Sequence, residues 1–365
     1  MVQIIIQPLN CVTMSYKIVQ NCLKCSLLAA GLLLFHVMQA QTGFSEVDQQ
    51  LTLRQKQLGK DYALQVWKRG DTLAYQKLAG EVKQKTSVQM AASSRWLTAA
   101  MVMLLVDEGK LSLDDKITRW LPEYEKYGKN YITLRHCLTY MTGIKGDGSG
   151  VGKLFSKKKF DNLEEEVNSY AAREIQTNPG TELRYNDIGF SIAARVLEVV
   201  TKKRFDQLIK QRLFTPLKMR STSFSNVSGG PVDPSNGAIS TVEDYMKFLV
   251  MLLNKGTYHG RRVLSEESVA ELLKQQGGSE PRKDLPKMVE GYAPALGSWI
   301  INSNSSSGPT VFASPGFAGP WAMIDLCRGY AYVFVVKEMK EEDNSKVQME
   351  LKAAVDAQFK EICQD

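Results

Sequence analysis

The sequence predicts an α/β protein of the α+β type, in which helices flank an antiparallel β-sheet and a mainly helical lobe is inserted. Runs that alternate between apolar and polar residues lie near both ends of the chain, whereas helical patterns fill the middle. The two ends must therefore meet to form one sheet. After a leader over residues 1–40, we expect one domain over 41–365. Its α/β lobe would comprise about 41–115 and 240–365, and its helical lobe about 116–239.

The N-terminus has the pattern of a secretory leader. Lys17 and Lys24 precede an apolar run over residues 26–35, and Ala40 follows as a small residue before a polar segment. The run is shorter than the ~20 residues that span a bilayer. We therefore expect a secreted or periplasmic protein with no stable membrane span after cleavage. Two alternatives are a true start at Met14 and an uncleaved leader that anchors the chain.

Composition and residue spacing exclude several classes of function. The formal charge of +7 is mild for 365 residues and the basic residues are spread along the chain, so it indicates no nucleic-acid partner. Beyond the leader, Cys137, Cys327 and Cys363 are odd in number and lack a paired spacing, so we expect neither a disulfide framework nor a zinc site. We expect structural roles for His136 and His259, no metal and no cofactor.

The predicted elements follow from periodicity and helix caps. We expect an amphipathic helix over 46–57, then a β-hairpin whose strands, 62–67 and 72–75, flank the turn Arg69-Gly70-Asp71. That tripeptide resembles an integrin ligand by its letters, but a hairpin turn is the interpretation that we favour. Further helices are expected at 94–106, 112–122, 133–143, 188–201, 245–253 and 345–359, strands at 297–302, 321–325 and 330–337, and an exposed loop at 146–159.

Five stretches of the chain follow the order and spacing of one known family. They are LLVDEGKLSLDDKITRWLP (104–122), ITLRHCLTYMTG (132–143), NPGTELRYNDIGF (178–190), STVEDYMKF (240–248) and SPGFAG (314–319). Together they resemble the serine β-lactamases and penicillin-binding proteins, in particular the class C-like branch with its D,D-peptidases and esterases. The resemblance covers most of residues 46–360. It implies a β-lactamase/transpeptidase-like fold and a mechanism in which a serine is acylated.

The resemblance also implies a catalytic centre, from which this sequence departs at two principal positions. The family's S-x-x-K motif reads Ala92-Ser93-Ser94-Arg95 here, so the nucleophile position holds no group that can attack. The lysine position is Arg95, whose guanidinium stays protonated in proteins and cannot serve as a base.

The other family positions are kept in part. The tyrosine of the Y-x-N motif is Tyr185, but its asparagine is Asp187. The third motif, often H-x-G or K-T-G, reads Ser314-Pro315-Gly316 here. The resemblance places the oxyanion hole at the backbone N–H groups of Ala92 and Phe317.

Three functional hypotheses remain open. In the first, the catalytic centre has decayed, Arg95 and Asp187 form an ion pair, and a peptidoglycan-like, β-lactam or ester ligand binds without turnover. In the second, the chain is an active esterase, D,D-peptidase or β-lactamase that uses Ser93, or another serine such as Ser314, with Tyr185. Ser93 lies about 200° round a helix from position 95, which favours the first hypothesis. The third is an interaction protein that binds a partner at the same place.

Overall fold

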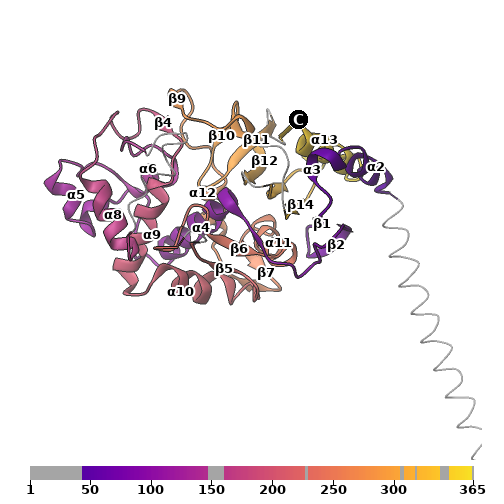
Figure 1. Ribbon diagram of the computed structural model, residues 1–365, viewed down its shortest axis with the longest axis horizontal. Coiled ribbons are helices and arrows are strands. Elements are labelled where there is room, and N and C mark those ends of the chain that lie inside the picture. Colours follow the sequence, from indigo (N-terminus) through magenta and orange to yellow (C-terminus); the bar gives the residue numbers. More distant parts are fainter. Residues whose placement is uncertain are drawn as a thin grey trace, which may run out of the picture.

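One antiparallel sheet joins the two ends of the chain, as the sequence predicts (Figure 1). In the part of the chain that the structure describes, its strand order is β10-β11-β12-β13-β14-β1-β2. β1 (Tyr62–Lys68) and β2 (Thr72–Leu78) form the expected hairpin, and β1 pairs with β14 (Tyr330–Val336). The other strands are β10 (Ala293–Pro294), β11 (Trp299–Asn304), β12 (Gly308–Pro315) and β13 (Trp321–Asp325).

The structure is a computed structural model, and it describes the domain but not the leader. The described residues are 43–146, 160–226, 229–304, 308–316, 319–337 and 345–363. The predicted leader and Met14 lie outside them, as does most of the loop predicted over 146–159. Within the described ranges, no helix is both long enough and apolar enough to span a bilayer.

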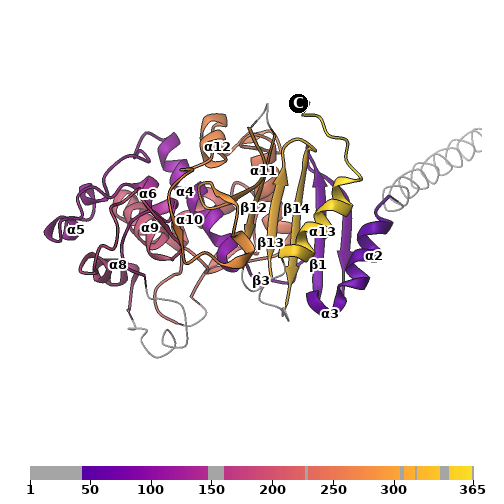
Figure 2. The same cartoon turned by 90° about the horizontal axis from the view of Figure 1, so that it is seen from above.

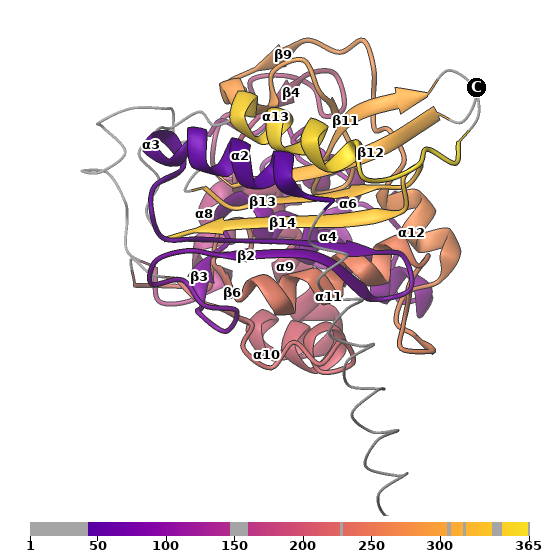
Figure 3. The ribbon, with the colours of Figure 1, turned by 90° about the vertical axis from the view of Figure 1, so that its right-hand side faces the viewer.

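Alternate residues of the central strands serve two separate cores. In β14, Tyr332 and Phe334 point to the side covered by α2 (Ser45–Leu53) and α13 (Ser345–Asp356). Val333 and the other β14 residues that alternate with Tyr332 and Phe334 pack into the larger core on the opposite side. Figure 3 shows α2, α3 (Gln55–Leu58) and α13 on one face of the sheet and α11 (Val242–Leu253) on the other. Both faces are thus buried, which explains why β14 reads as a continuous apolar run.

The helix that carries the family's first motif lies between the two lobes. α4 (Ser94–Asp107) is buried over most of its length and packs against α9 (Ile188–Thr201) of the helical lobe (Figure 2). The remaining helices and helical turns are η1 (Ala91–Ser93), η2 (Ile117–Arg119), α5 (Glu123–Lys126), α6 (Leu134–Leu138), α8 (Leu163–Ala171), α10 (Phe205–Ile209), the π-helical turn η3 (Lys210–Phe214), α12 (Glu266–Leu272) and η4 (Lys287–Val289). The short strands are β3 (Val88–Gln89), β4 (Leu183–Arg184), β5 (Ser223–Phe224), β6 (Ala238–Ser240), β7 (Thr257–Tyr258), β8 (Arg261–Arg262) and β9 (Arg282–Lys283).

Two of the predicted helices are wrong in extent. The helix expected from Ser112 to Pro122 is replaced by a turn followed by the short helix η2. In the turn, the Asp115 carboxylate accepts the Ser112 N–H and the Ser112 hydroxyl accepts the Asp114 N–H. Such local side-chain bonds compete with a helix. The helix expected over 133–143 has its predicted cap at Thr133 but ends at Leu138. Strand β12 was not predicted at all, since its sequence does not alternate.

The expectation that the cysteines are unpaired is wrong for two of them. Cys327, in the turn between β13 and β14, forms a disulfide with Cys363, 36 residues later. The pairing escapes the sequence because the chain returns from α13 to that turn, where the Ile362 N–H donates to the Cys327 carbonyl at 2.9 Å. Cys137 is a buried free thiol.

Reduction of the disulfide should destabilise the domain. A cross-link between positions 36 residues apart contributes about 3–4 kcal/mol in the loop-entropy account. We expect a reductant to lower the urea midpoint of the wild type, followed by circular dichroism. The double variant Cys327→Ala/Cys363→Ala should show the lowered midpoint with and without reductant. An unchanged wild-type midpoint under reductant would contradict the pairing.

Candidate functional site

The start of α4 keeps an unusual backbone geometry. Ala91, directly before the predicted nucleophile position, has φ 45°, a left-handed conformation that costs a non-glycine residue about 1–2 kcal/mol. Opposite it, a Cβ added to Gly316 would lie 2.8 Å from the Met90 carbonyl oxygen and 3.3 Å from the Ala91 Cβ. The end of β12 therefore packs directly on η1, and only a residue without a side chain fits at position 316. Ala92 itself is 4% exposed.

Arg95 is buried within a group of aromatic rings. Its side chain is 2% exposed, and its guanidinium carbon lies 4.3 Å from the ring centre of Tyr185, 5.3 Å from that of Tyr140 and 5.6 Å from that of Phe190. Tyr140 stacks on Tyr185 at 5.0 Å and on Trp299 of β11 at 5.6 Å. Stacking of a cation on several desolvated rings is favourable, and it suits the flat guanidinium better than an ammonium.

An ion pair completes the surroundings of Arg95. The structure contains the Arg95–Asp187 pair hypothesised from the motifs, with 2.5 Å between Nη2 and Oδ1. Arg95 Nη1 also donates to the Tyr140 hydroxyl at 3.2 Å. The Asp187 side chain is 40% exposed, so one partner faces solvent while the other is enclosed. Two of the three family positions that differ here, Arg95 at the lysine position and Asp187 at the asparagine position, therefore contact each other.

Charge and burial fix the protonation states in this cluster. Burial disfavours the Arg95 charge, yet Tyr140, Tyr185 and Asp187 hold the pKa of Arg95 above its ordinary value. Burial raises the pKa of Tyr185 and outweighs the lowering effect of Arg95; the pKa of Tyr140 is raised for the same reason. Both phenols are therefore neutral at pH 7. A neutral phenol with a raised pKa is a poor general base.

A second carboxylate, Asp233, lies close to this cluster. Burial raises its pKa, and the negative charge of Asp187 adds to the effect. The backbone N–H groups of Ser235 and Asn236 oppose it by donating to Asp233 Oδ1 at 2.9 and 3.0 Å. The Ser235 hydroxyl in turn donates to the Asp187 carbonyl oxygen at 3.2 Å. The loop around residue 233 is thereby tied to the start of α9.

The hydroxyl groups near Ala92 are all engaged with backbone carbonyls. Ser93 Oγ donates to the Ser314 carbonyl oxygen at 2.5 Å, and Ser94 Oγ donates to that of Ala91 at 2.6 Å. Ser314 Oγ lies 3.3 Å from the Gly297 carbonyl oxygen and 3.5 Å from that of Ala92. Ser93, Ser94 and Ser314 are each at most 3% exposed. These contacts hold η1 against β12 and leave each of these hydroxyls enclosed.

The histidines are placed as structural residues. His136 accepts the Thr133 N–H through Nδ1 and forms a capping box at the start of α6. His259 Nε2 lies 2.7 Å from Asp71 Oδ2. Asp71 thus pairs within the protein, and the Arg-Gly-Asp tripeptide is the hairpin turn that the sequence predicts.

Some site residues were predicted and others were not. The structure brings Ala92, Arg95, Tyr185, Asp187 and Gly316 to one region, whereas Phe317, the second predicted oxyanion-hole residue, lies outside the described residues. Sequence reasoning missed Tyr140, Phe190, Trp299 and Asp233, which only the fold brings there. Among the described residues, no group of three or more histidine, cysteine or acidic side chains could hold a metal ion.

Known proteins share this fold. Residues 55–356 match the profile of a family described as Beta-lactamase. An uncharacterized protein of Mycobacterium tuberculosis is 27% identical over 320 residues, which cover 70% of this chain and 78% of the relative. A crystal structure of a Bacteroides dorei protein assigned as a beta-lactamase has a TM-score of 0.76 at 24% identity, covering 86% of this chain and 98% of that one. A family VIII carboxylesterase has a TM-score of 0.70 at 16% identity, covering 87% and 98%.

Removal of the buried guanidinium should destabilise the fold. We expect Arg95→Met to lower the free energy of unfolding by about 3 kcal/mol, the low end for a broken buried pair because Asp187 is partly exposed. Arg95→Lys should lower the free energy of unfolding by less, because lysine keeps the charge but does not stack on the rings as a guanidinium does. Arg173→Met is the matched control, since Arg173 also stacks on a tyrosine, at 4.5 Å, but is only half-buried. Equal losses at both arginines, in urea denaturation, would contradict the importance of burial.

The raised pKa of Asp233 predicts a pH dependence of stability. Folding favours the protonated carboxyl, so the wild type loses stability as the pH rises from the ordinary value of 3.8 through the higher folded-state pKa. Asp233→Asn cannot titrate and its side-chain oxygen can accept the same N–H groups. We expect the variant to be more stable than the wild type above this pH range and equally stable below it. The free energy of unfolding of both proteins is measured by denaturation from pH 3 to 8. A difference between them that does not change with pH would show that the Asp233 pKa is not raised.

Proposed function

This chain belongs to the beta-lactamase family, and from that premise we propose that it is a secreted member that no longer performs serine acyl transfer. The scaffold is the β-lactamase/penicillin-binding-protein fold, on which esterases are also built. A fold of this kind hosts several activities, so the proposal rests on the site and not on the scaffold.

The observation that carries the proposal is the buried Arg95 next to Ala92. A serine acylation site needs an attacking hydroxyl and a nearby group that can take its proton. Ala92 offers a methyl group, and Arg95 keeps its proton because the guanidinium is enclosed and paired with Asp187. The two changes remove the attacking atom and the proton acceptor together.

Other residues do not replace the lost pair. The hydroxyls of Ser93, Ser94 and Ser314 are buried and donate to carbonyl oxygens, so each would have to break a bond before it could attack. The raised pKa of Tyr185 argues against its use as a base near neutral pH. These contacts weigh against the alternative of an active hydrolase that uses Ser93 or Ser314.

The disulfide supports the proposed compartment. Disulfides persist in oxidising environments such as the periplasm or the outside of the cell. The Cys327–Cys363 bond is therefore consistent with the secretory pattern of residues 1–40.

We further propose that any ligand binds without a covalent bond. Tyr185, Asp187 and Asp233 are partly exposed residues of the site. A flat aromatic surface beside a carboxylate can bind a peptidoglycan-like, β-lactam or ester molecule by contact and hydrogen bonding, with no acyl intermediate.

Covalent trapping tests the proposal. We expect no adduct with a labelled penicillin or a fluorophosphonate, and hydrolysis of nitrocefin and p-nitrophenyl esters no faster than the buffer rate. Intact-protein mass spectrometry and absorbance provide the two readouts. Labelling of the wild type that disappears in Ser93→Ala or Ser314→Ala would support the active-hydrolase alternative and contradict the proposal.

A restored site is the matched positive control. Ala92→Ser with Arg95→Lys returns the attacking hydroxyl and the proton acceptor, and Asp187→Asn then returns the neutral partner. We expect the triple variant to label more readily than the double variant, because Asp187 would otherwise hold the new lysine protonated. The single variant Ala92→Ser should stay unlabelled while Arg95 is present.

A further inference from the structure

The positive charge of this protein is concentrated in one short segment. Residues 202–220 hold seven cations and a single carboxylate, a net charge of +6. The whole chain has a formal charge of +7, so all other residues together sum to +1. The expectation of evenly spread basic residues is therefore wrong for this segment.

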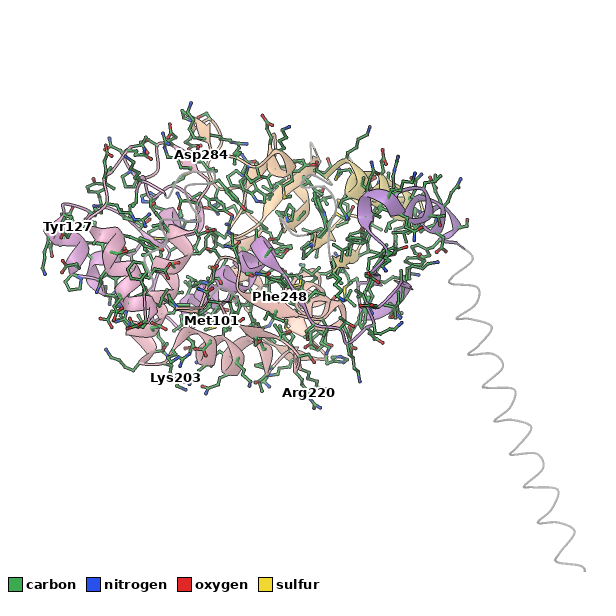
Figure 4. The ribbon with its side chains drawn as sticks, viewed as in Figure 1. Met101, Tyr127, Lys203, Arg220, Phe248 and Asp284 are labelled. Carbon is green, nitrogen blue, oxygen red and sulfur yellow. A yellow bond between two sulfur atoms is a disulfide. The ribbon has the colours of Figure 1, made fainter. Side chains whose placement is uncertain are left out.

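The fold turns these cations outward along one side of the molecule. In α10 and η3 the apolar side chains are buried, whereas Lys210, which lies between them in the sequence, is exposed. The buried apolar residues of the segment are Phe205, Leu208, Ile209, Leu213, Phe214, Leu217 and Met219. Figure 1 places α10 at the lower edge of the molecule, and Figure 4 shows Lys203 and Arg220 along that same edge.

Five of the seven cations form no ion pair with a carboxylate of the described residues. Arg204 pairs with Asp206, and Arg212 pairs with Glu108. The others, which we name the basic edge, are Lys202, Lys203, Lys210, Lys218 and Arg220. All five are exposed, and none forms an ion pair with an acidic side chain of the described residues. Lys203 donates to the amide oxygen of Gln211 at 2.7 Å, which leaves its charge uncompensated.

We propose that the basic edge docks on the surface of an anionic phospholipid bilayer. Clustered lysine and arginine side chains near a negatively charged membrane each add to the affinity through long-range attraction. Because the apolar residues of the segment are fully buried, the contact is with headgroups and not with the hydrocarbon interior.

Two other classes of partner, single-stranded nucleic acid and protein, fit the basic edge less well. Single-stranded nucleic acid is usually bound with aromatic rings that stack on the bases, and both phenylalanines of the segment are at most 1% exposed. A protein partner needs a buried apolar or aromatic anchor at the centre of its interface. The basic edge offers only long, mobile cations. None of these residues contacts Arg95 or Asp187, so membrane docking does not depend on whether a serine is acylated.

Vesicle co-sedimentation tests the proposal with the full chain. Phosphatidylcholine vesicles with and without phosphatidylglycerol serve as the probe, at low and high salt. We expect binding that requires phosphatidylglycerol and weakens as salt shortens the screening length. Substitution of all five basic-edge residues by glutamine should lower the partition coefficient at least ~100-fold, since each cation adds roughly a fivefold factor. The leader is common to all variants, so differences between them come from the edge.

The control removes as many charges elsewhere. Lys56, Lys60, Lys283, Lys287 and Lys360 are exposed and lie on or beside α3, β9, η4 and α13. Their joint substitution by glutamine should change the partition coefficient less than ~3-fold if position matters and total charge does not. Equal losses in both variants, each with an unchanged thermal midpoint, would overturn the proposal. So would retention of the wild type on heparin without any binding to anionic vesicles, which would indicate a soluble polyanion.

Discussion

The site depends on how a buried guanidinium is kept stable. A charge removed from water costs several kcal/mol unless partners surround it, and Arg95 is 2% exposed. Its partners come from separate elements: Tyr140 follows α6, Asp187 directly precedes α9, and Trp299 on β11 stacks on the Tyr140 ring. One side chain of α4 thereby links the sheet to the helical lobe. The Tyr140 backbone adopts φ 62°, a strained conformation that places its ring in this stack.

This arrangement explains why the changed motif positions belong together. A lysine in a serine acylation site must be able to give up its proton, so the surroundings must not hold its charge too strongly. Arg95 with Asp187 does the opposite, because the carboxylate and two tyrosine oxygens stabilise the cation. Position 92 has no hydroxyl that would pass a proton to Arg95, and a permanently charged, tightly packed residue is compatible with the fold.

The sequence predicted the scaffold better than the site. The hairpin 62–78, the buried helix α4 and strand β13 follow from local periodicity, and the meeting of the two chain ends follows from where the strands lie. The Arg95–Asp187 pair could be predicted because both residues stand at positions of the family's motifs. The roles of Tyr140, Trp299 and Asp233 could not be predicted. Tyr140 and Asp233 lie in loops whose conformation no periodic pattern encodes, and Trp299 on β11 meets Tyr140 only through the tertiary fold. The Cys327–Cys363 bond was missed for the same reason.

The backbone around Ala92 also has a structural role, because it packs against the end of the sheet strand β12. Ala91 has a left-handed φ, and Gly316 has no side chain at the point where η1 approaches it closely. The Ser93 and Ser314 contacts hold the same two elements together. These interactions fix the start of α4 against the end of β12, so they contribute to folding as well as to the shape of the site. None of these folding contacts requires a hydroxyl at position 92, so the geometry of this region does not depend on acyl transfer.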